Sequence, residues 1–317
     1  MDDDRIAKLN FLADVAEALL VEGLTQQEAA TRFNLSRPSI SRLLNEAREQ
    51  GLVKVEIKRI ASEYIDLASE ISERYAIARV HVAGIANSDI SDHFAHYSAE
   101  RVAEYLKAGT VLGITLGTTL GKLIYQLARM DPKQISVVQL CGSVGTGSPM
   151  LDSHSLVAHL AQAYGANSLH LHAPYAVETA EMRDMLNDHP ANRLCLELGR
   201  KADVALVGVG TITPRFSSLH LGGHQSTTVM QSFQDAGAVG DVAGFFFDHN
   251  GQPLRVDRSK FWKTGLDVDE FMGIPHRIGV AASPHKASAI IASLKGGWIN
   301  EIITDRETAE AILNQRD

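Results

Sequence analysis

Hydrophobic residues recur at two different spacings, and the change between them divides the chain. Over residues 5–50 they recur every three to four positions, which predicts three short helices at 5–22, 25–33 and 36–50. From residue 77 onward, short apolar runs rich in β-branched residues alternate with amphipathic stretches. This alternation predicts a mostly parallel sheet with helices on both faces, so we expect an α/β domain behind a helical N-terminal domain.

The local signals of the N-terminal part predict a winged helix-turn-helix. Thr25 and Glu28 have the spacing of a capping box at the start of the second helix. Ser36 is suited to cap the third helix after a short turn, and Gly51 is suited to end it. Residues 52–57 then alternate as a half-exposed wing strand would. Such a domain places its third helix in the major groove of DNA.

The third helix carries a basic face, although the chain as a whole has a net charge of −8. Residues 32–59 hold seven Lys and Arg against three Glu, a balance of +4. The candidates for base or groove contacts are Arg37, Ser39, Ser41 and Arg42, and those for phosphate contacts are Thr25, Gln26, Arg48 and Lys54. The alternative is a helical hairpin whose charged face is simply solvated.

Residues 60–75 contain a short seam at coiled-coil spacing, formed by Ile60, Tyr64, Leu67 and Ile71. A helix here could pair two subunits, or it could pack on its own domain. Pairing is favoured because one helix-turn-helix reads only half of an operator. The expected organisation is therefore a DNA-binding domain at 1–58, a linker or dimerisation helix at 59–76 and an effector domain at 77–317.

The pattern from residue 77 predicts individual elements of the α/β domain. Strands are expected at 79–85, 110–116, 135–140, 168–172, 204–209, 241–247, 278–282 and 298–303. Helices are expected at 89–107, 118–130, 151–164, twice within 178–202, and at 225–236, 285–295 and 306–315. A turn is expected at 249–252, and the irregular stretch 211–224 is long enough to form a lid over a ligand.

Four loops that follow predicted strands are rich in glycine and hydroxyl groups: 113–119, 141–148, 208–211 and 283–286. Open parallel sheets bind ligands at this edge, and glycines let the backbone approach an anion. Lys286 could reach a phosphate, with His285 beside it, and Asp241 could accept hydrogen bonds from sugar hydroxyls. Each loop has a steric alternative, because tight strand-to-helix turns also need glycine.

Bulk properties exclude several classes of protein. The chain of 317 residues has room for two domains, and no apolar run approaches the length of a membrane helix. The N-terminus lacks the features of a signal peptide, and two cysteines form no disulfide framework, so we expect a cytoplasmic protein. No cofactor or metal is expected. Cys141 is interpreted as a small hydrophobe rather than a redox sensor, and the histidines are interpreted as polar pocket lining rather than metal ligands: His154, His170, His172, His220 and His224.

Motifs along nearly the whole chain resemble the SorC/DeoR-type sugar-binding transcriptional regulators, the family of the sorbitol- and deoxyribonucleoside-operon repressors. The matching stretches are residues 24–57, 111–123 (VLGITLGTTLGKL), 137–145 (VVQLCGSVG), 202–212, 237–254 and 278–305. The resemblance implies an effector domain similar to glucosamine-6-phosphate isomerase, a phosphorylated sugar as effector, and a dimer or tetramer.

The resemblance also implies roles for individual residues. Those that would hold the phosphate are Thr115, Gly117, Thr118, Thr119, Gly142, Ser143 and Lys286, whereas Asp241 would hold hydroxyls. Where Cys141 stands, the deoxyribonucleoside repressor has a lysine that binds its sugar covalently. A thiol cannot form that imine, so we expect a different ligand chemistry at this position.

Three functions fit these features. The leading interpretation is a transcriptional regulator that binds double-stranded operator DNA as a homo-oligomer under control of a sugar or sugar phosphate. The resemblance implies that it acts as a repressor. The second is a sugar-phosphate isomerase or deaminase with Asp241 and His285 as acid–base candidates, although the sequence shows no compact catalytic triad. The third is an architectural DNA-binding protein, which would leave the glycine-rich loops without a role.

Overall fold

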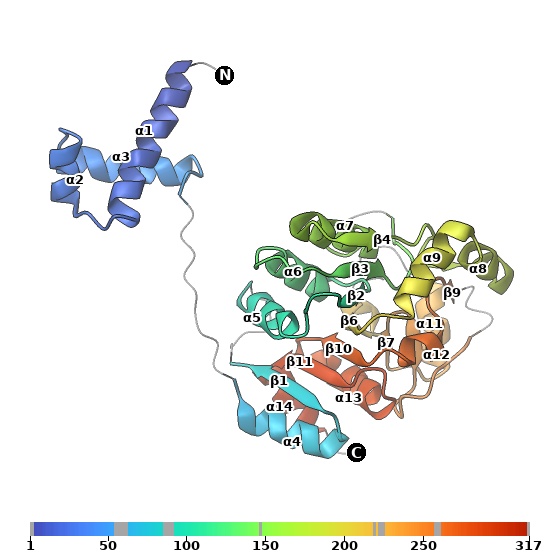
Figure 1. The fold of residues 1–317 in the computed structure, drawn as a ribbon. Helices are drawn as coiled ribbons and strands as arrows, with labels where there is room; N and C mark the ends of the chain where they lie inside the picture. The colour runs from blue at the N-terminus through green and yellow to red at the C-terminus, as the bar shows by residue number, and fades with distance from the viewer. Residues whose placement is uncertain are drawn as a thin grey trace. The chain divides into compact units, whose positions relative to one another are not determined.

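The computed structural model describes residues 3–53, 63–84, 92–145, 148–217, 220, 226–256 and 261–315. They divide into two compact units, Met1–Ile60 and Ala61–Asp317 (Figure 1). Each unit has its own hydrophobic core. Among the described residues, no helix combines the length and the apolar character that spanning a bilayer requires.

The N-terminal unit contains the three expected helices, α1 (Asp3–Leu20), α2 (Gln26–Arg32) and α3 (Arg37–Glu49). The predicted capping box is confirmed: the Glu28 amide donates to Thr25 Oγ1 at 3.3 Å, and the Thr25 amide donates to Glu28 Oε2 at 2.8 Å. Ser36 caps α3, and Gly51 ends it with a φ of +72° that favours glycine. Lys54 and most of the predicted wing strand lie outside the described residues.

The C-terminal unit is built on a parallel sheet with the strand order β1-β11-β10-β6-β2-β3-β4. Its strands are β1 (Arg79–Ala83), β2 (Val111–Ile114), β3 (Ser136–Gln139), β4 (Asn167–Leu169), β6 (Val204–Thr211), β10 (His276–Val280) and β11 (Glu301–Asp305). Neighbours along this path pair in parallel. The expectation of a mostly parallel sheet is therefore confirmed.

Helices cover both faces of this sheet (Figure 1). One face packs against α5 (Asp92–Ala103), α6 (Thr118–Leu127) and α7 (Ser153–Tyr164). The other packs against α4 (Ile65–Tyr75), α9 (Pro190–Gly199), α13 (Ala287–Lys295) and α14 (Arg306–Asn314). Residues of β6 alternate between the two cores, with Leu206 in one and Val207 in the other. This explains why β6 reads as a continuous apolar run.

The expected single strand at 241–247 is wrong. The chain reverses inside it, giving two antiparallel strands, β7 (Gly240–Val242) and β8 (Phe245–Phe247). Ala243 and Gly244 form the turn with φ values of 53° and 83°. The Gly244 amide donates to Asp241 Oδ2 at 3.3 Å, which closes the turn. Six consecutive apolar or glycine positions after Asp241 concealed this reversal.

The two helices expected within 178–202 are α8 (Ala180–Asn187) and α9, and the helix expected at 225–236 is α11 (Thr227–Asp235). Further short elements were not predicted as such: β5 (Ala176–Val177), the 3-10 turn η1 (Pro214–Phe216), β9 (Trp262–Lys263), α12 (Val268–Met272) and the 3-10 turn η3 (Pro284–Lys286). β5 and β9 pair in antiparallel fashion although they are far apart in the chain. Strands of two residues are too short to show a periodicity, so the sequence could not indicate them.

α4 packs within the C-terminal unit. Ile71 is completely buried, and Leu67 and Tyr64 lie against the same core as β1 and α14. Three of the four seam residues therefore pack within their own domain, whereas Ile60 lies outside the described residues. Ile65, the first residue of α4, is 69% exposed.

Two isoleucines of α4 offer a matched test of this packing. Ile71→Ala should lower the free energy of unfolding of the C-terminal unit by about 2–5 kcal/mol, because it leaves a cavity in the core. Ile65→Ala removes an equal number of methyl groups from the surface and should change it by about 0.5 kcal/mol or less. Urea unfolding of both variants measures the difference. Equal effects would show that α4 does not pack as described.

Candidate functional site

The order of strands reverses between β2 and β6. The chain continues from β2 to β3 and β4 on one side, while β6 is followed by β10 and β11 on the other. The loops that leave these strands diverge to opposite faces and leave a crevice at the carboxyl edge of the sheet. The cavity found here, called the switch-point cavity, is lined by Leu116, Thr118, Thr119, Tyr175, Gly208, Val209, Gly210, Thr211, Phe216, Ser217, Asp241, Ala243 and Lys286.

The N-terminus of α6 forms one wall of the switch-point cavity. Thr118 and Thr119 are its first two residues and line the cavity. Its N-cap is Gly117, which has a φ of +144° and provides no capping side chain. Uncapped amides at the positive end of a helix dipole attract an anion. This wall is therefore suited to a phosphate or carboxylate.

Lys286 supplies a cation from the opposite side of the reversal. It ends η3, directly after β10, and its side chain is half-buried against the cavity. Burial lowers the pKa of Lys286 below its ordinary value, and the negative charge of Asp241 partly offsets this. Among the described residues, no side chain forms a hydrogen bond or an ion pair with its Nζ. The cavity therefore holds a positive charge without a close counter-ion.

Asp241 lies opposite Gly210 in the β6–β7 ladder. A Cβ at position 210 would lie 2.0 Å from Asp241 Oδ1, so the carboxylate can take this place only because residue 210 is glycine. Burial raises the pKa of Asp241 to about 6, although the Gly244 amide and Lys286 act in the opposite direction. Asp241 thus combines a hydrogen-bonding carboxyl group with a charge that is costly to bury.

Tyr175 lines the same cavity, and the sequence did not indicate it. Its side chain is 4% exposed, and its hydroxyl is buried without a hydrogen-bond partner among the described residues. Burial, together with the charge of Asp241, raises the pKa of Tyr175 well above its ordinary value. A buried hydroxyl without a partner costs free energy that a ligand could recover. Tyr175 precedes a two-residue strand in a region without periodicity, so no local signal marks it.

The structure brings together part of the predicted set. Thr118, Thr119, Asp241 and Lys286 line the switch-point cavity, as does the whole predicted loop 208–211. His285 is exposed and stacks on Phe216, with ring centroids 3.9 Å apart, so it adjoins the cavity through that ring.

Four other predicted residues have their groups engaged elsewhere. Thr115 is buried and its hydroxyl donates to the Leu206 carbonyl at 3.1 Å. Ser143 donates to the carboxylate of Asp152. A Cβ at Gly142 would lie 2.2 Å from the Pro174 carbonyl oxygen, so this glycine permits close packing of two backbone segments. Thr115, Cys141, Gly142 and Ser143 do not line the switch-point cavity.

Cys141 is completely buried beside Tyr175. Burial raises the pKa of its thiol to about 11, so the reactive thiolate is scarce at neutral pH. Of the histidines singled out in the sequence, His154 and His170 pack with their ring centroids 4.4 Å apart, and His224 lies outside the described residues. The described residues contain no group of three or more potential ligands that could hold a metal ion.

The DNA-binding candidates lie on the expected surface of the N-terminal unit. Arg37, Arg42 and Arg48 are exposed on α3. Ser39 and Ser41 are half-buried, and Ser39 Oγ lies 2.8 Å from Ser36 Oγ within the helix cap. Thr25 and Gln26 are exposed at the start of α2, but the Thr25 hydroxyl already donates to Glu28 at 2.8 Å. The arginines therefore remain the stronger candidates.

A helix-turn-helix unit with an exposed basic helix, joined to an α/β unit with a cavity for an anion, defines the class of ligand-controlled DNA-binding regulators. Comparison with known proteins agrees with this class. Residues 60–314 match the family model "Putative sugar-binding domain", and residues 9–58 match the MarR family model. The chain belongs to this sugar-binding family and is a transcriptional regulator of the SorC/DeoR type.

Relatives and solved structures match over most of the chain. The transcriptional regulator LsrR of Escherichia coli strain K12 is 29% identical over 296 residues, which cover 92% of this chain and 90% of that protein. LsrR of Enterobacter sp. strain 638 is also 29% identical and covers 99% of both chains. The full-length sorbitol operon regulator SorC from Klebsiella pneumoniae has a TM-score of 0.71 at 23% identity, over 99% of this chain and 100% of that chain. This last likeness shows a shared fold.

The raised pKa of Asp241 makes stability depend on pH in a defined direction. The folded state binds the proton more tightly than the unfolded state, so stability falls as pH rises from the unfolded value of 3.8 through about 6. Asp241→Asn removes this dependence. The difference in unfolding free energy between the variant and the wild type should grow in favour of the variant by about 2 kcal/mol from pH 4.5 to 7.5.

Thermal and urea unfolding of both proteins without ligand measure this difference. The pH dependence of other groups cancels in the comparison, since the two proteins differ at one position. A difference that stays constant across this pH range would contradict the burial of the Asp241 charge.

Proposed function

We propose that the protein controls a carbohydrate or polyol catabolic operon as a repressor, and that its effector is a phosphorylated sugar bound in the switch-point cavity. The supporting observation is that Lys286, the uncapped start of α6 and Asp241 line one cavity. A cation and free helix amides suit a phosphate, whereas carboxylates suit sugar hydroxyls. The chemistry of the cavity therefore supports a ligand that carries both a phosphate and hydroxyl groups.

The proposed binding mode assigns the two ends of the effector. The phosphate lies at the start of α6, held by the amides and hydroxyls of Thr118 and Thr119 and by Lys286. The sugar hydroxyls donate to Asp241 and bind the Tyr175 hydroxyl, which has no hydrogen-bond partner among the described residues. Gly208 and Gly210 line the cavity along β6 without side chains. Phe216 closes the cavity on the side of the 3-10 turn η1.

The output of the protein is binding to double-stranded DNA through α3. One such helix reads half of an operator, so we propose a homo-oligomer, a dimer or a tetramer, in the cytoplasm. The effector controls DNA binding by favouring one arrangement of the paired DNA-binding units, which is a coupling free energy between two sites.

A second candidate function is an enzyme that isomerises or deaminates a sugar phosphate. The observation that favours it is the pKa of Asp241, about 6, in a cavity, because a general base works best with a pKa near the operating pH. The relatives are named transcriptional regulators, which favours the first candidate. Incubating the full-length protein with the sugar phosphate that binds it, and following product formation, separates the two.

Lys286 is the residue to test for recognition of the phosphate. Thermal-shift screening of phosphorylated sugars, free sugars and polyols identifies the effector. Lys286→Met should then weaken the binding of a phosphorylated sugar roughly 30-fold, about 2 kcal/mol, because a charged hydrogen bond is lost. Isothermal titration measures the affinity. Lys201→Met, which changes an exposed lysine outside the cavity, is the matched control.

The same titrations, made with a sugar and with its phosphate, show whether the phosphate group contributes to binding. If the unphosphorylated sugar binds as tightly as its phosphate to the wild type, the proposed phosphate site is wrong even if the protein is a sugar sensor. If neither variant changes the affinity, the ligand lies outside the switch-point cavity.

Two arginines of α3 separate base recognition from phosphate binding. Arg42→Ala should remove the preference for the region upstream of the protein's own gene over random DNA. The difference in binding free energy between the two DNAs should shrink by about 1–3 kcal/mol. Arg48→Ala should weaken binding to both DNAs alike and reduce the slope of log affinity against log salt by about 1. Fluorescence polarisation at several salt concentrations measures both effects. Retention of sequence preference in Arg42→Ala would contradict its role in the groove.

A further inference from the structure

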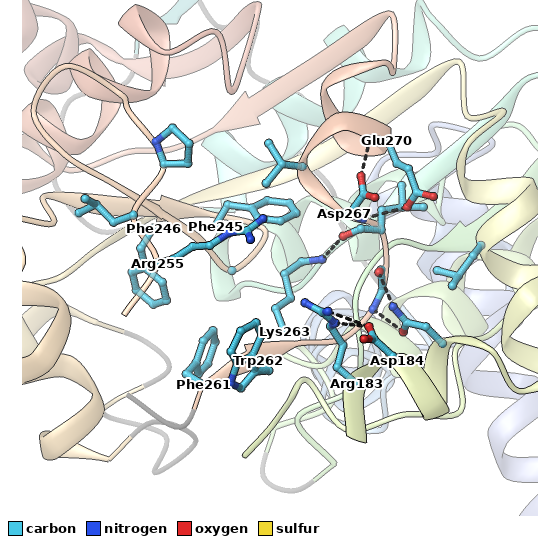
Figure 2. A pocket seen from close by; sticks show the side chains of 18 of the residues that line it. Arg183, Asp184, Phe245, Phe246, Arg255, Phe261, Trp262, Lys263, Asp267 and Glu270 are labelled. Carbon is cyan, nitrogen blue, oxygen red and sulfur yellow. Dashed lines mark hydrogen bonds and ion pairs between the residues drawn. The ribbon is translucent and has the colours of Figure 1, made fainter. Parts of the chain in front are cut away.

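A second and larger cavity lies in the C-terminal unit, with a volume of about 540 Å³. Its walls come from α8, α9, β8, residues 253–256, β9 and α12 (Figure 2). Its lining shares no residue with that of the switch-point cavity. This volume is within the range of sites that bind small molecules, about 300–1,000 Å³. We call it the aromatic cavity.

Aromatic side chains dominate one part of the aromatic cavity. The lining includes Phe233, Phe245, Phe246, Phe261 and Trp262. Phe261 and Trp262 are half-buried and leave part of their surface available. Arg183 stacks over the Trp262 ring at 5.1 Å from the centroid, which holds that ring in place. Flat aromatic surfaces of this kind favour a ligand with a flat ring.

Lys263 brings a positive charge among these rings. Its Nζ donates to the Leu266 carbonyl at 2.6 Å and lies 4.3 Å from the Phe245 ring centroid (Figure 2). Among the described residues, no carboxylate forms an ion pair with it. Burial lowers the pKa of Lys263 to about 8. A half-buried ammonium with one carbonyl and one ring as neighbours is incompletely compensated.

The nearby acidic residues are already engaged. Glu270 pairs with Arg200, and the Glu270 amide donates to Asp267 Oδ1 at 2.8 Å in the N-cap of α12. Asp184 pairs with Arg183 at 2.7 Å. Arg255, by contrast, lines the cavity and is exposed, with no hydrogen bond or ion pair to any described residue. Lys263 and Arg255 are therefore two cations without close counter-ions at one ligand-sized cavity.

We propose that the aromatic cavity is a second binding site, which takes a small planar organic anion whose ring lies against Trp262 and Phe261 and whose anionic group pairs with Lys263. Arg255 adds a second cation at the solvent side. An anion there forms the ion pair that no carboxylate of the described residues forms with Lys263. A sugar phosphate without a flat ring would leave the aromatic walls unused.

The turn at Gly244 lies between the two cavities, so a ligand in the aromatic cavity could change how the switch-point cavity binds its effector. A Cβ at Gly244 would lie 2.6 Å from the Tyr175 hydroxyl and 3.1 Å from Cδ of Lys263. Gly244 belongs to the turn between β7, which carries Asp241, and β8, which carries Phe245. A ligand in the aromatic cavity therefore contacts the turn that positions Asp241 in the switch-point cavity.

The probe for this site is 8-anilinonaphthalene-1-sulfonate, a fluorescent sulfonate with a flat naphthalene ring, added to the full-length protein. Energy transfer from Trp262 and Trp298 reports that the probe binds, and the lysine variants below locate it. Lys263→Met should weaken binding about tenfold or more, because it removes the charge and keeps the length of the side chain. Lys286→Met in the switch-point cavity and Lys201→Met on the surface should leave the affinity unchanged. Thermal unfolding confirms that each variant is folded.

A pH titration gives a second and independent measurement. Affinity in the wild type should fall as pH rises above about 8, since Lys263 loses its charge, and should not fall in Lys263→Met. The charged and titratable groups that act on Lys263 are Cys141, Asp267, Glu270 and Arg183. The thiol of Cys141 has a pKa of about 11, so it stays neutral in this range.

Three results would overturn the proposal. Loss of binding in Lys286→Met instead of Lys263→Met would place the probe in the switch-point cavity. Equal affinities in all variants would show adsorption to the surface. If Lys263→Met does not fold, an affinity of the wild type that is constant from pH 7 to pH 9.5 decides against the site. None of these results bears on sugar-phosphate binding, which is measured separately.

Discussion

The reversal of strand order between β2 and β6 is the constraint on which the switch-point cavity depends. Parallel strands that neighbour each other but send their loops to opposite faces cannot close the edge between them. The start of α6 and the 3-10 turn before α13 approach this opening from the two sides, and β7 covers its far end by pairing with β6. The opening therefore receives free helix amides, a lysine and a carboxylate from segments far apart in the chain.

These groups are arranged at a cost to stability. Lys286 has no close counter-ion among the described residues, Asp241 is buried enough to raise its pKa to about 6, and the Tyr175 hydroxyl has no partner. A protein selected for stability alone would not keep three incompletely satisfied polar groups together. Such clusters are typical of binding sites, where a ligand supplies the missing partners. The aromatic cavity likewise contains two cations without close counter-ions among the described residues, Lys263 and Arg255. Gly244 lies between the aromatic cavity and the switch-point cavity.

The N-terminal unit obeys a different physical requirement. Its small core rests on Val15, Ala29, Ala30 and Ile40, with short helices that need their caps. The capping box of α2 and the Ser36 cap of α3 satisfy amides that so small a core could not compensate. The arginines of α3 stay exposed, and this is the surface that we propose for DNA binding.

The sequence by itself determined whatever depends on neighbours within a few residues. The capping box of Thr25 and Glu28, the alternation of strands with helices, and the loops carrying Thr118 and Lys286 are local patterns, because helix and strand periods act over one or two turns. Only the tertiary structure decided which distant groups meet: the pairing of β5 with β9, the place of Tyr175 beside Asp241, and the engagement of Ser143 by Asp152. Strand order and close packing set those contacts, and neither leaves a periodic trace in the chain.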